Sequence, residues 1–142
     1  GTMLLNCGMS QQLVVNGSFT NHGTLQLLAG TAIAVSGSFV NHGTIDLITS
    51  PNGLPPGLIN NGVIINSSSV VIQSIDLTDG EVVIAIQTVA NHGYQLQRSP
   101  SLSAPVWTDI GSQEPGNGSV VTLVDSPAPA GGQFFYRVLV AP

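Results

Sequence analysis

Two histidines recur in the same sequence context, and paired imidazoles are groups that a metal ion could use. His22 and His42 both stand in the pattern Phe-x-Asn-His-Gly, twenty residues apart. If the two segments lie in neighbouring strands, the rings come within ~5 Å of each other and could share a zinc ion. The third copy of the pattern has Asn61 at this position, so no third ligand is evident. We therefore expect exposed, stacked histidines at a corner, no metal site and no cofactor.

The acidic residues do not form the pair of carboxylates that glycosidic hydrolysis requires. They are scattered, and Asp46 is the only acid within the repeated segment described below. No serine lies in a nucleophile-elbow motif, no Ser-His-Asp arrangement can be assigned, and Gly-rich phosphate loops are absent. We therefore expect that the protein is not an enzyme, and a polysaccharide lyase or hydrolase is the least favoured class.

Aromatic residues gather in the last third of the chain, and their flat faces stack well on sugar rings. The candidate ligand contacts here are Trp107, Tyr94 and Phe135. The favoured interpretation of Trp107 and Tyr136 is that they are core residues of the sandwich. In a strand over 134–140, alternation places Phe135 and Tyr136 on opposite faces. Both faces then contain apolar side chains, so one of them must be partly exposed or covered by the first half of the chain.

The composition excludes several classes of partner. Charged residues are 6% of the 142 residues, and the formal net charge is −5, whereas ordinary domains have about 25% charged residues. The only cations are Arg98 and Arg137, which argues against nucleic acid and against an anionic membrane surface. No apolar run reaches the ~18 residues of a membrane span, so we expect no membrane insertion. Cys7 is the only cysteine and permits no disulfide framework.

An internal repeat in the first half of the chain indicates which secondary-structure elements position the repeated side chains. Residues 13–31 and 33–52 match at a shift of 20, and a weaker third copy follows at a shift of 19. The identical positions in the first two copies are Val15/Val35, Gly17/Gly37, Ser18/Ser38, Phe19/Phe39, Asn21/Asn41, His22/His42, Gly23/Gly43, Thr24/Thr44 and Leu27/Leu47. One copy is too short to bury its own apolar face, but copies stacked ~4.8 Å apart share a continuous interior.

Equivalent residues of the copies should then form columns. Alternation predicts that apolar side chains of one face stack from copy to copy: Phe19, Leu25 and Leu27 lie above Phe39, Ile45 and Leu47. Glycines follow each Asn-His or Asn-Asn pair, where we expect a corner with positive φ: Gly23, Gly43 and Gly62. A ladder of hydrogen-bonded amides is expected from Asn21, Asn41 and Asn60, which are also candidate contacts for sugar hydroxyls.

The repeat period disappears after Ser74, and antiparallel signals follow. Short apolar runs predict strands at 70–77, 81–89, 94–98, 106–110, 119–124 and 134–140. Asp79-Gly80 between the first two is a strong hairpin turn. Six short strands at this spacing indicate a small β-sandwich, and almost no helix is expected.

Both halves resemble known bacterial architectures. The N-G-S-F-x-N-H-G-T-[LI]-x-L copies resemble rungs of parallel β-helices in autotransporter passengers, adhesins and polysaccharide-active proteins, over about residues 13–75. The segments 94–99, 106–110 and 134–138 resemble a C-terminal module of large secreted surface proteins, similar to a fibronectin type III sandwich with one strand fewer, over about residues 76–142. The resemblance implies a secreted or cell-surface bacterial protein.

We therefore expect an all-β chain in two parts. Residues 1–75 form a short parallel β-solenoid of three rungs, with an N-terminal cap over 3–12. Residues 76–142 form an antiparallel β-sandwich that caps the solenoid. If a solenoid strand replaces the strand that the sandwich lacks, the two parts pack as one unit. The expected function is a non-catalytic module that binds a polysaccharide or cell-surface glycan, or adheres to a surface. The alternative is a purely structural stalk or cap, which could form a homo-oligomer through solenoid edges.

Overall fold

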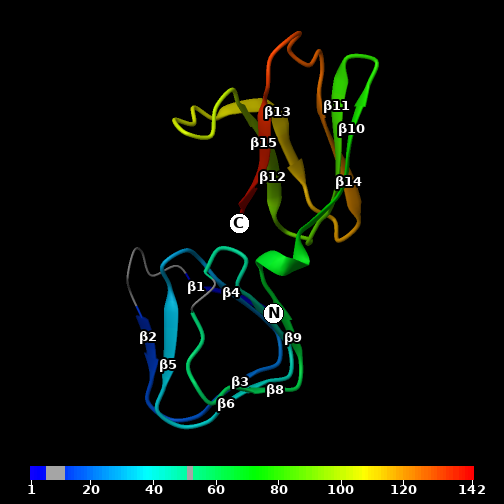
Figure 1. The fold of residues 1–142 in the computed structure, drawn as a ribbon. Coiled ribbons are helices and arrows are strands. Elements are labelled where there is room, and N and C mark those ends of the chain that lie inside the picture. The colour runs from blue at the N-terminus through cyan, green and yellow to red at the C-terminus, as the bar shows by residue number, and fades with distance from the viewer. Residues whose placement is uncertain (6–11, 51–52) are drawn as a thin grey trace. The chain divides into compact units, whose positions relative to one another are not determined.

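Strands make up almost all the regular structure of this chain (Figure 1). The computed structural model describes residues 1–5, 12–50 and 53–142. Within these ranges the only helical element is a single 3-10 turn, Ser67–Ser69, and parallel and antiparallel sheets are both present, which confirms the all-β prediction. Cys7 and most of the expected cap lie outside the described residues. None of the described helices could span a bilayer.

The first compact unit, Gly1–Ser68, contains three parallel sheets. One has the order β1 (Thr2–Leu5), β4 (Thr24–Leu27), β7 (Thr44–Asp46) and β9 (Val63–Ile65). A second pairs β2 (Gln12–Val15) with β5 (Ala32–Val35). The third has the order β3 (Phe19–Asn21), β6 (Phe39–Asn41) and β8 (Ile59–Asn60). Each sheet therefore pairs equivalent strands of successive copies. The third copy contributes β8 and β9 to two of the sheets and, among the described residues, no strand to the β2-β5 sheet.

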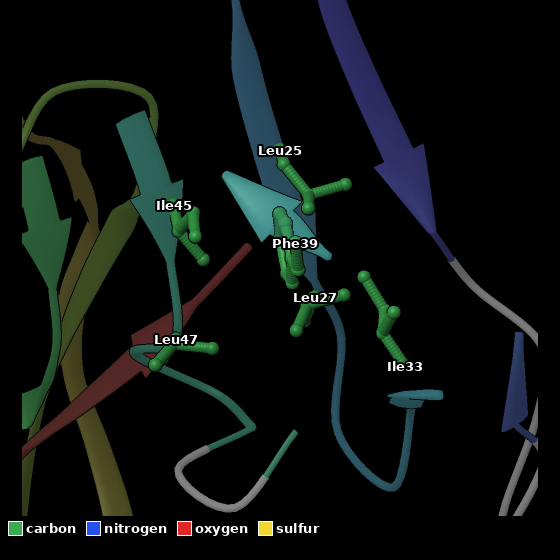
Figure 2. Packing of buried hydrophobic residues seen from close by; sticks show 6 residues of the cluster. All are labelled: Leu25, Leu27, Ile33, Phe39, Ile45 and Leu47. Atoms are coloured by element: carbon green, nitrogen blue, oxygen red, sulfur yellow. The ribbon is translucent and has the colours of Figure 1, made fainter. Parts of the chain in front are cut away.

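Equivalent residues of neighbouring copies are direct strand partners. Phe19 pairs with Phe39 in parallel, and their ring centroids are 5.1 Å apart. Leu25 pairs with Ile45 in the same way. The predicted apolar columns are thus confirmed, and they form one core whose buried members are directed toward one another in Figure 2: Leu25, Leu27, Ile33, Phe39, Ile45 and Leu47.

The glycines at the corners have a different role from the expected one. Gly23, Gly43 and Gly62 are not among the described residues with positive φ, so that prediction is wrong. Instead, a Cβ on Gly43 would collide with the carbonyl oxygen of Gly23, and one on Gly62 would collide with that of Gly43. Glycine is required because successive backbones approach closely at this corner.

The first five residues belong to the same parallel arrangement. Strand β1 pairs with β4 in the register Thr2 with Thr24 through Leu5 with Leu27. Gly1, Thr2 and Leu5 are identical to Gly23, Thr24 and Leu27, so this segment is a further partial copy of the repeat. Residues 2–5 of the chain therefore extend a parallel sheet at its edge.

The second compact unit, Ser69–Pro142, contains two antiparallel three-stranded sheets. One has the order β10 (Val71–Thr78), β11 (Glu81–Gln87) and β14 (Val120–Asp125). The other has the order β13 (Thr108–Pro115), β12 (Gly93–Ser99) and β15 (Phe135–Ala141). All six predicted strands occur. The expected boundary at 75/76 falls inside β10, because that whole strand pairs with β11.

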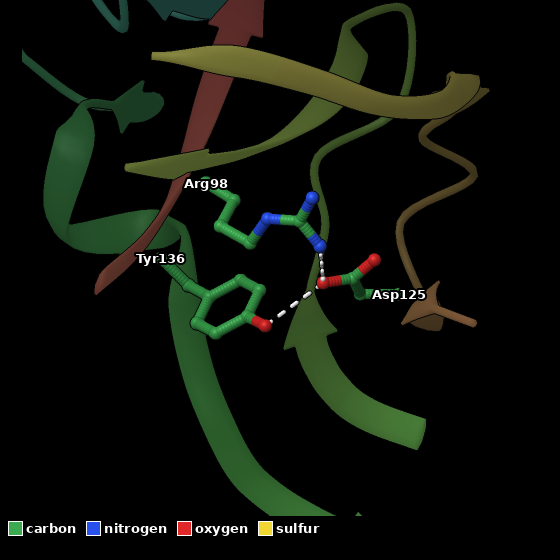
Figure 3. A network of polar contacts seen from close by, with 3 residues as sticks. All are labelled: Arg98, Asp125 and Tyr136. Atoms are coloured by element: carbon green, nitrogen blue, oxygen red, sulfur yellow. Dashed lines mark hydrogen bonds and ion pairs between the residues drawn. The ribbon is translucent and has the colours of Figure 1, made fainter. Parts of the chain in front are cut away.

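Both sheets contribute to one core in the second unit, made of Ile84, Ile86, Tyr94, Leu96 and Leu123. The predicted Asp79-Gly80 turn is confirmed by φ values of 52° and 79°, which suit a two-residue hairpin with left-handed central residues. A polar network joins the two sheets: Nη1 of Arg98 in β12 lies 2.6 Å from Oδ2 of Asp125 in β14. The hydroxyl of Tyr136 in β15 donates to the same oxygen at 2.8 Å (Figure 3).

Candidate ligand-binding face

The asparagine ladder exists, but its amides are used within the protein. Nδ2 of Asn21 donates to Oδ1 of Asn41 at 2.7 Å, and Nδ2 of Asn41 donates to Oδ1 of Asn60 at 2.7 Å. Asn21 is 7% exposed and Asn41 0% exposed. Asn60 is exposed, and its amide also bonds to the backbone of Gly62. The predicted ladder is confirmed, whereas the buried amides of Asn21 and Asn41 cannot reach a ligand.

The two repeated histidines stack as predicted. The rings of His22 and His42 are 5.1 Å apart and inclined by 6°, and both side chains are exposed. The third copy has Asn61 at the equivalent position, so the stack contains two imidazoles and no third. Among residues 1–5, 12–50 and 53–142, no three His, Cys, Asp or Glu side chains cluster so that they could hold a metal ion.

Tyr94 is a core residue and not a ligand contact. Its side chain is 0% exposed. Its hydroxyl accepts from the backbone N–H of Val89 at 2.7 Å and donates to the carbonyl oxygen of the same residue at 3.3 Å. A ring with no free face cannot stack on a sugar, so the prediction of Tyr94 as a ligand contact is wrong.

The other two aromatic candidates lie on the outer face of the β13-β12-β15 sheet. Tyr136 bonds to Asp125 between the sheets, so Phe135 and Arg137, its neighbours along β15, face outward. Trp107 immediately precedes β13, is partly exposed, and has Cζ of Arg137 only 4.3 Å from its ring centroid. The structure therefore brings an aromatic ring and a cation together on this face.

A row of polar side chains crosses the same face. Arg137 and Asp109 are the strand partners of Gln97, one on each side. Nε of Arg137 donates to Oε1 of Gln97 at 2.7 Å, and Nε2 of Gln97 donates to Oδ1 of Asp109 at 2.6 Å. We call Trp107, Phe135, Arg137, Gln97 and Asp109 the Trp107 face.

Gln97 and Asp109 were not predicted as site residues. Alternation along 94–98 identifies Gln97 as facing away from the core, but nothing local shows which residues lie beside it. That information comes from the pairing of β12 with both neighbours. The row becomes visible only when three segments separated in sequence are aligned.

The Trp107 face offers donors and acceptors held beside an aromatic ring. Gln97 is buried at 9% exposure, which fixes the middle of the row, while Arg137 and Asp109 are exposed. Within the described part of the chain, no other hydrogen bond engages the Nη atoms of Arg137 or Oδ2 of Asp109. The charges of Arg137 and Asp109 offset each other, so the face is polar but locally neutral.

No family model, curated protein or solved structure matches this chain. The resemblance to parallel β-helices and to a fibronectin type III module thus remains an expectation based on the residues alone.

Proposed function

We propose that this protein binds carbohydrate without catalysis, through the Trp107 face. The observation that carries the proposal is the position of Arg137, which lies over Trp107 while the hydrogen-bonded row continues through Gln97 to Asp109. The ring of Trp107 supplies a surface for the C–H face of a sugar, and Arg137 and Asp109 supply donors and acceptors for its hydroxyls.

The arrangement suits an uncharged polysaccharide or cell-surface glycan. The row is held in place by its own hydrogen bonds, so binding would cost little side-chain entropy. A net charge of −5 disfavours a polyanionic ligand. We also propose that the protein is a secreted or cell-surface bacterial protein, because glycans are accessible outside the cell.

We further infer that the first unit is a short parallel β-solenoid of three rungs. Support comes from three parallel sheets that pair equivalent strands of successive copies, two of them through all three copies, and from the continuous ladder of Asn21, Asn41 and Asn60. This ladder also favours the second candidate function, a structural stalk or cap, because it uses the repeated amides for stability and buries those of Asn21 and Asn41.

A screen against insoluble plant and microbial polysaccharides tests the proposal. We expect the full chain to bind at least one, and Trp107→Ala to weaken that binding about tenfold or more, as for a central aromatic contact. Val14→Ala, which shortens an exposed side chain in the first unit, is the control and should bind normally. Absence of binding to every polysaccharide would favour the stalk, and cleavage of any polymer would overturn the non-catalytic assignment.

A further inference from the structure

The second unit has a half-open pocket of about 220 Å³ that is separate from the Trp107 face. It lies between β13 and β14, the strands at the edges of the two sheets. The apolar part of its lining is Leu96, Ile110, Leu123 and Val124, together with Gly111. The polar part is Ser112, Glu114 and Thr122.

An irregularity in β13 places Glu114 in this pocket. Leu96 pairs with Ile110, so a regular antiparallel ladder would place Ser112 opposite Tyr94. Tyr94 pairs instead with Glu114, because β13 contains two more residues than β12 between these pairs (114 − 110 = 4 against 96 − 94 = 2). Gly111, with φ of 65°, begins the extra segment, and Nε2 of Gln95 donates to the carbonyl oxygen of Ile110 at 3.0 Å. The bulge is therefore an ordered feature with its own hydrogen bonds.

Glu114 is a carboxylate in partly apolar surroundings. Its side chain is half-buried, and no hydrogen bond or ion pair to it occurs among the residues that the structure describes. A carboxylate removed from water without a partner is costly. Both cations of the chain are engaged elsewhere, since Arg98 bonds to Asp125 and Arg137 lies on Trp107. Neither cation pairs with Glu114 in the described structure, so an ammonium group from another molecule would give this carboxylate an ion-pair partner.

We propose that this pocket binds a primary ammonium group on a short aliphatic stem, such as a lysine side chain or a free alkylamine. The stem would lie on Leu96, Ile110 and Leu123, as lysine stems commonly do on apolar surface. The ammonium has three donors, which match the carboxylate of Glu114 and the hydroxyls of Ser112 and Thr122. The volume is below the ~300–1,000 Å³ of pockets for drug-sized ligands, and the net charge of −5 attracts a cation.

Chemical-shift titration of the full chain with n-butylamine and with 1-butanol tests the ligand class. We expect saturable shifts of the methyl groups of Leu96, Ile110 and Leu123 with the amine, and at least about tenfold weaker binding of the alcohol. Glu114→Gln should weaken amine binding by a similar factor. Asp76→Asn, which removes one exposed charge in β10, is the charge-matched control and should not.

Two further experiments separate the sources of the amine and guard against misfolding. Ser112→Phe should block the mouth of the pocket while Glu114 is retained, so it too should abolish the shifts. A lysine-containing peptide that binds more tightly than butylamine, and loses binding on Nε-acetylation, would identify a protein partner; tighter binding of a free diamine would identify a small molecule. Equal binding of amine and alcohol, no methyl shifts with the amine, or unchanged binding by Glu114→Gln would overturn the proposal.

Discussion

The side-chain amide of Asn21 donates a 2.7 Å hydrogen bond to Oδ1 of Asn41, its strand partner in the next copy of the repeat. Asn41 is fully buried, and its Oδ1 also accepts from the backbone N–H of Gly43 at 3.2 Å. The side chain of Asn41 thus provides a hydrogen-bond partner for the backbone at the corner of its own copy, and it also links the copies on both sides.

Replacing Asn41 should therefore destabilise the first unit strongly. We expect Asn41→Ala to lower its free energy of unfolding by about 2–4 kcal/mol, because several buried polar groups lose their partners together. Asn16→Ala is the control, since Asn16 is exposed, and should cost less than about 0.5 kcal/mol. Urea denaturation monitored by amide hydrogen exchange would resolve the first unit. Equal effects of the two substitutions would show that the ladder contributes nothing.

The close approach at Gly43 predicts a backbone clash. In Gly43→Ala the new Cβ would meet the backbone of His22 and Gly23, and the copies would have to separate, weakening the 2.8 Å bond from Thr44 N to Gly23 O. We expect a loss of stability of about 2 kcal/mol or more. Gly1 occupies the same repeat position with nothing within 4 Å of an added Cβ, so Gly1→Ala should be nearly neutral. Thermal unfolding of both variants checks this, and a neutral Gly43→Ala would contradict the packing explanation.

The Arg98–Asp125–Tyr136 network predicts a loss of stability in alkali. Burial raises the pKa of Tyr136 above its ordinary value of 10.0, and the hydrogen bond to Asp125 raises this pKa further. Between pH 10.0 and the folded-state pKa, the folded protein holds a proton that the unfolded chain has lost, so stability falls as pH rises. Below this window Tyr136 contributes no pH dependence, because it is protonated in both states.

Tyr136→Phe should remove this part of the alkaline slope. At neutral pH the variant should lose only about 1 kcal/mol, for the hydrogen bond to Asp125. Chemical denaturation at neutral pH and at several values above 10 would compare it with the natural chain. An unchanged slope in Tyr136→Phe would assign the alkaline sensitivity to other groups.

The contact between Arg137 and Trp107 can be followed by fluorescence, because Trp107 is the only tryptophan of the chain. Arg137→Ala should make the indole more accessible to acrylamide, since the guanidinium then no longer covers one face of the ring. A bound glycan should have the opposite effect and reduce quenching. Arg98→Ala does not remove this contact and serves as the comparison if it remains folded. Unchanged quenching in Arg137→Ala would mean that the guanidinium does not shield Trp107 in solution.

Much of the architecture could be predicted because it follows from local, repeated information. The twenty-residue match places Phe19 beside Phe39 whatever lies elsewhere, and alternation identifies which side chains of each strand face the core. Asp79-Gly80 specifies its own turn, since few residues adopt two successive positive φ values. Even the stacking of His22 on His42 follows from their equal positions in two copies.

The candidate sites depend on contacts that no local pattern contains. Tyr94 and Trp107 are both aromatic, yet the sandwich core buries the first and leaves the second partly exposed under Arg137. The two extra residues in β13 decide that Glu114, and not Ser112, lies opposite Tyr94. The sequence by itself thus determined the period, the strands and the columns, because these depend on neighbours along the chain. The tertiary structure alone decided which polar groups remain for a ligand, because burial and pairing join segments that are distant in sequence.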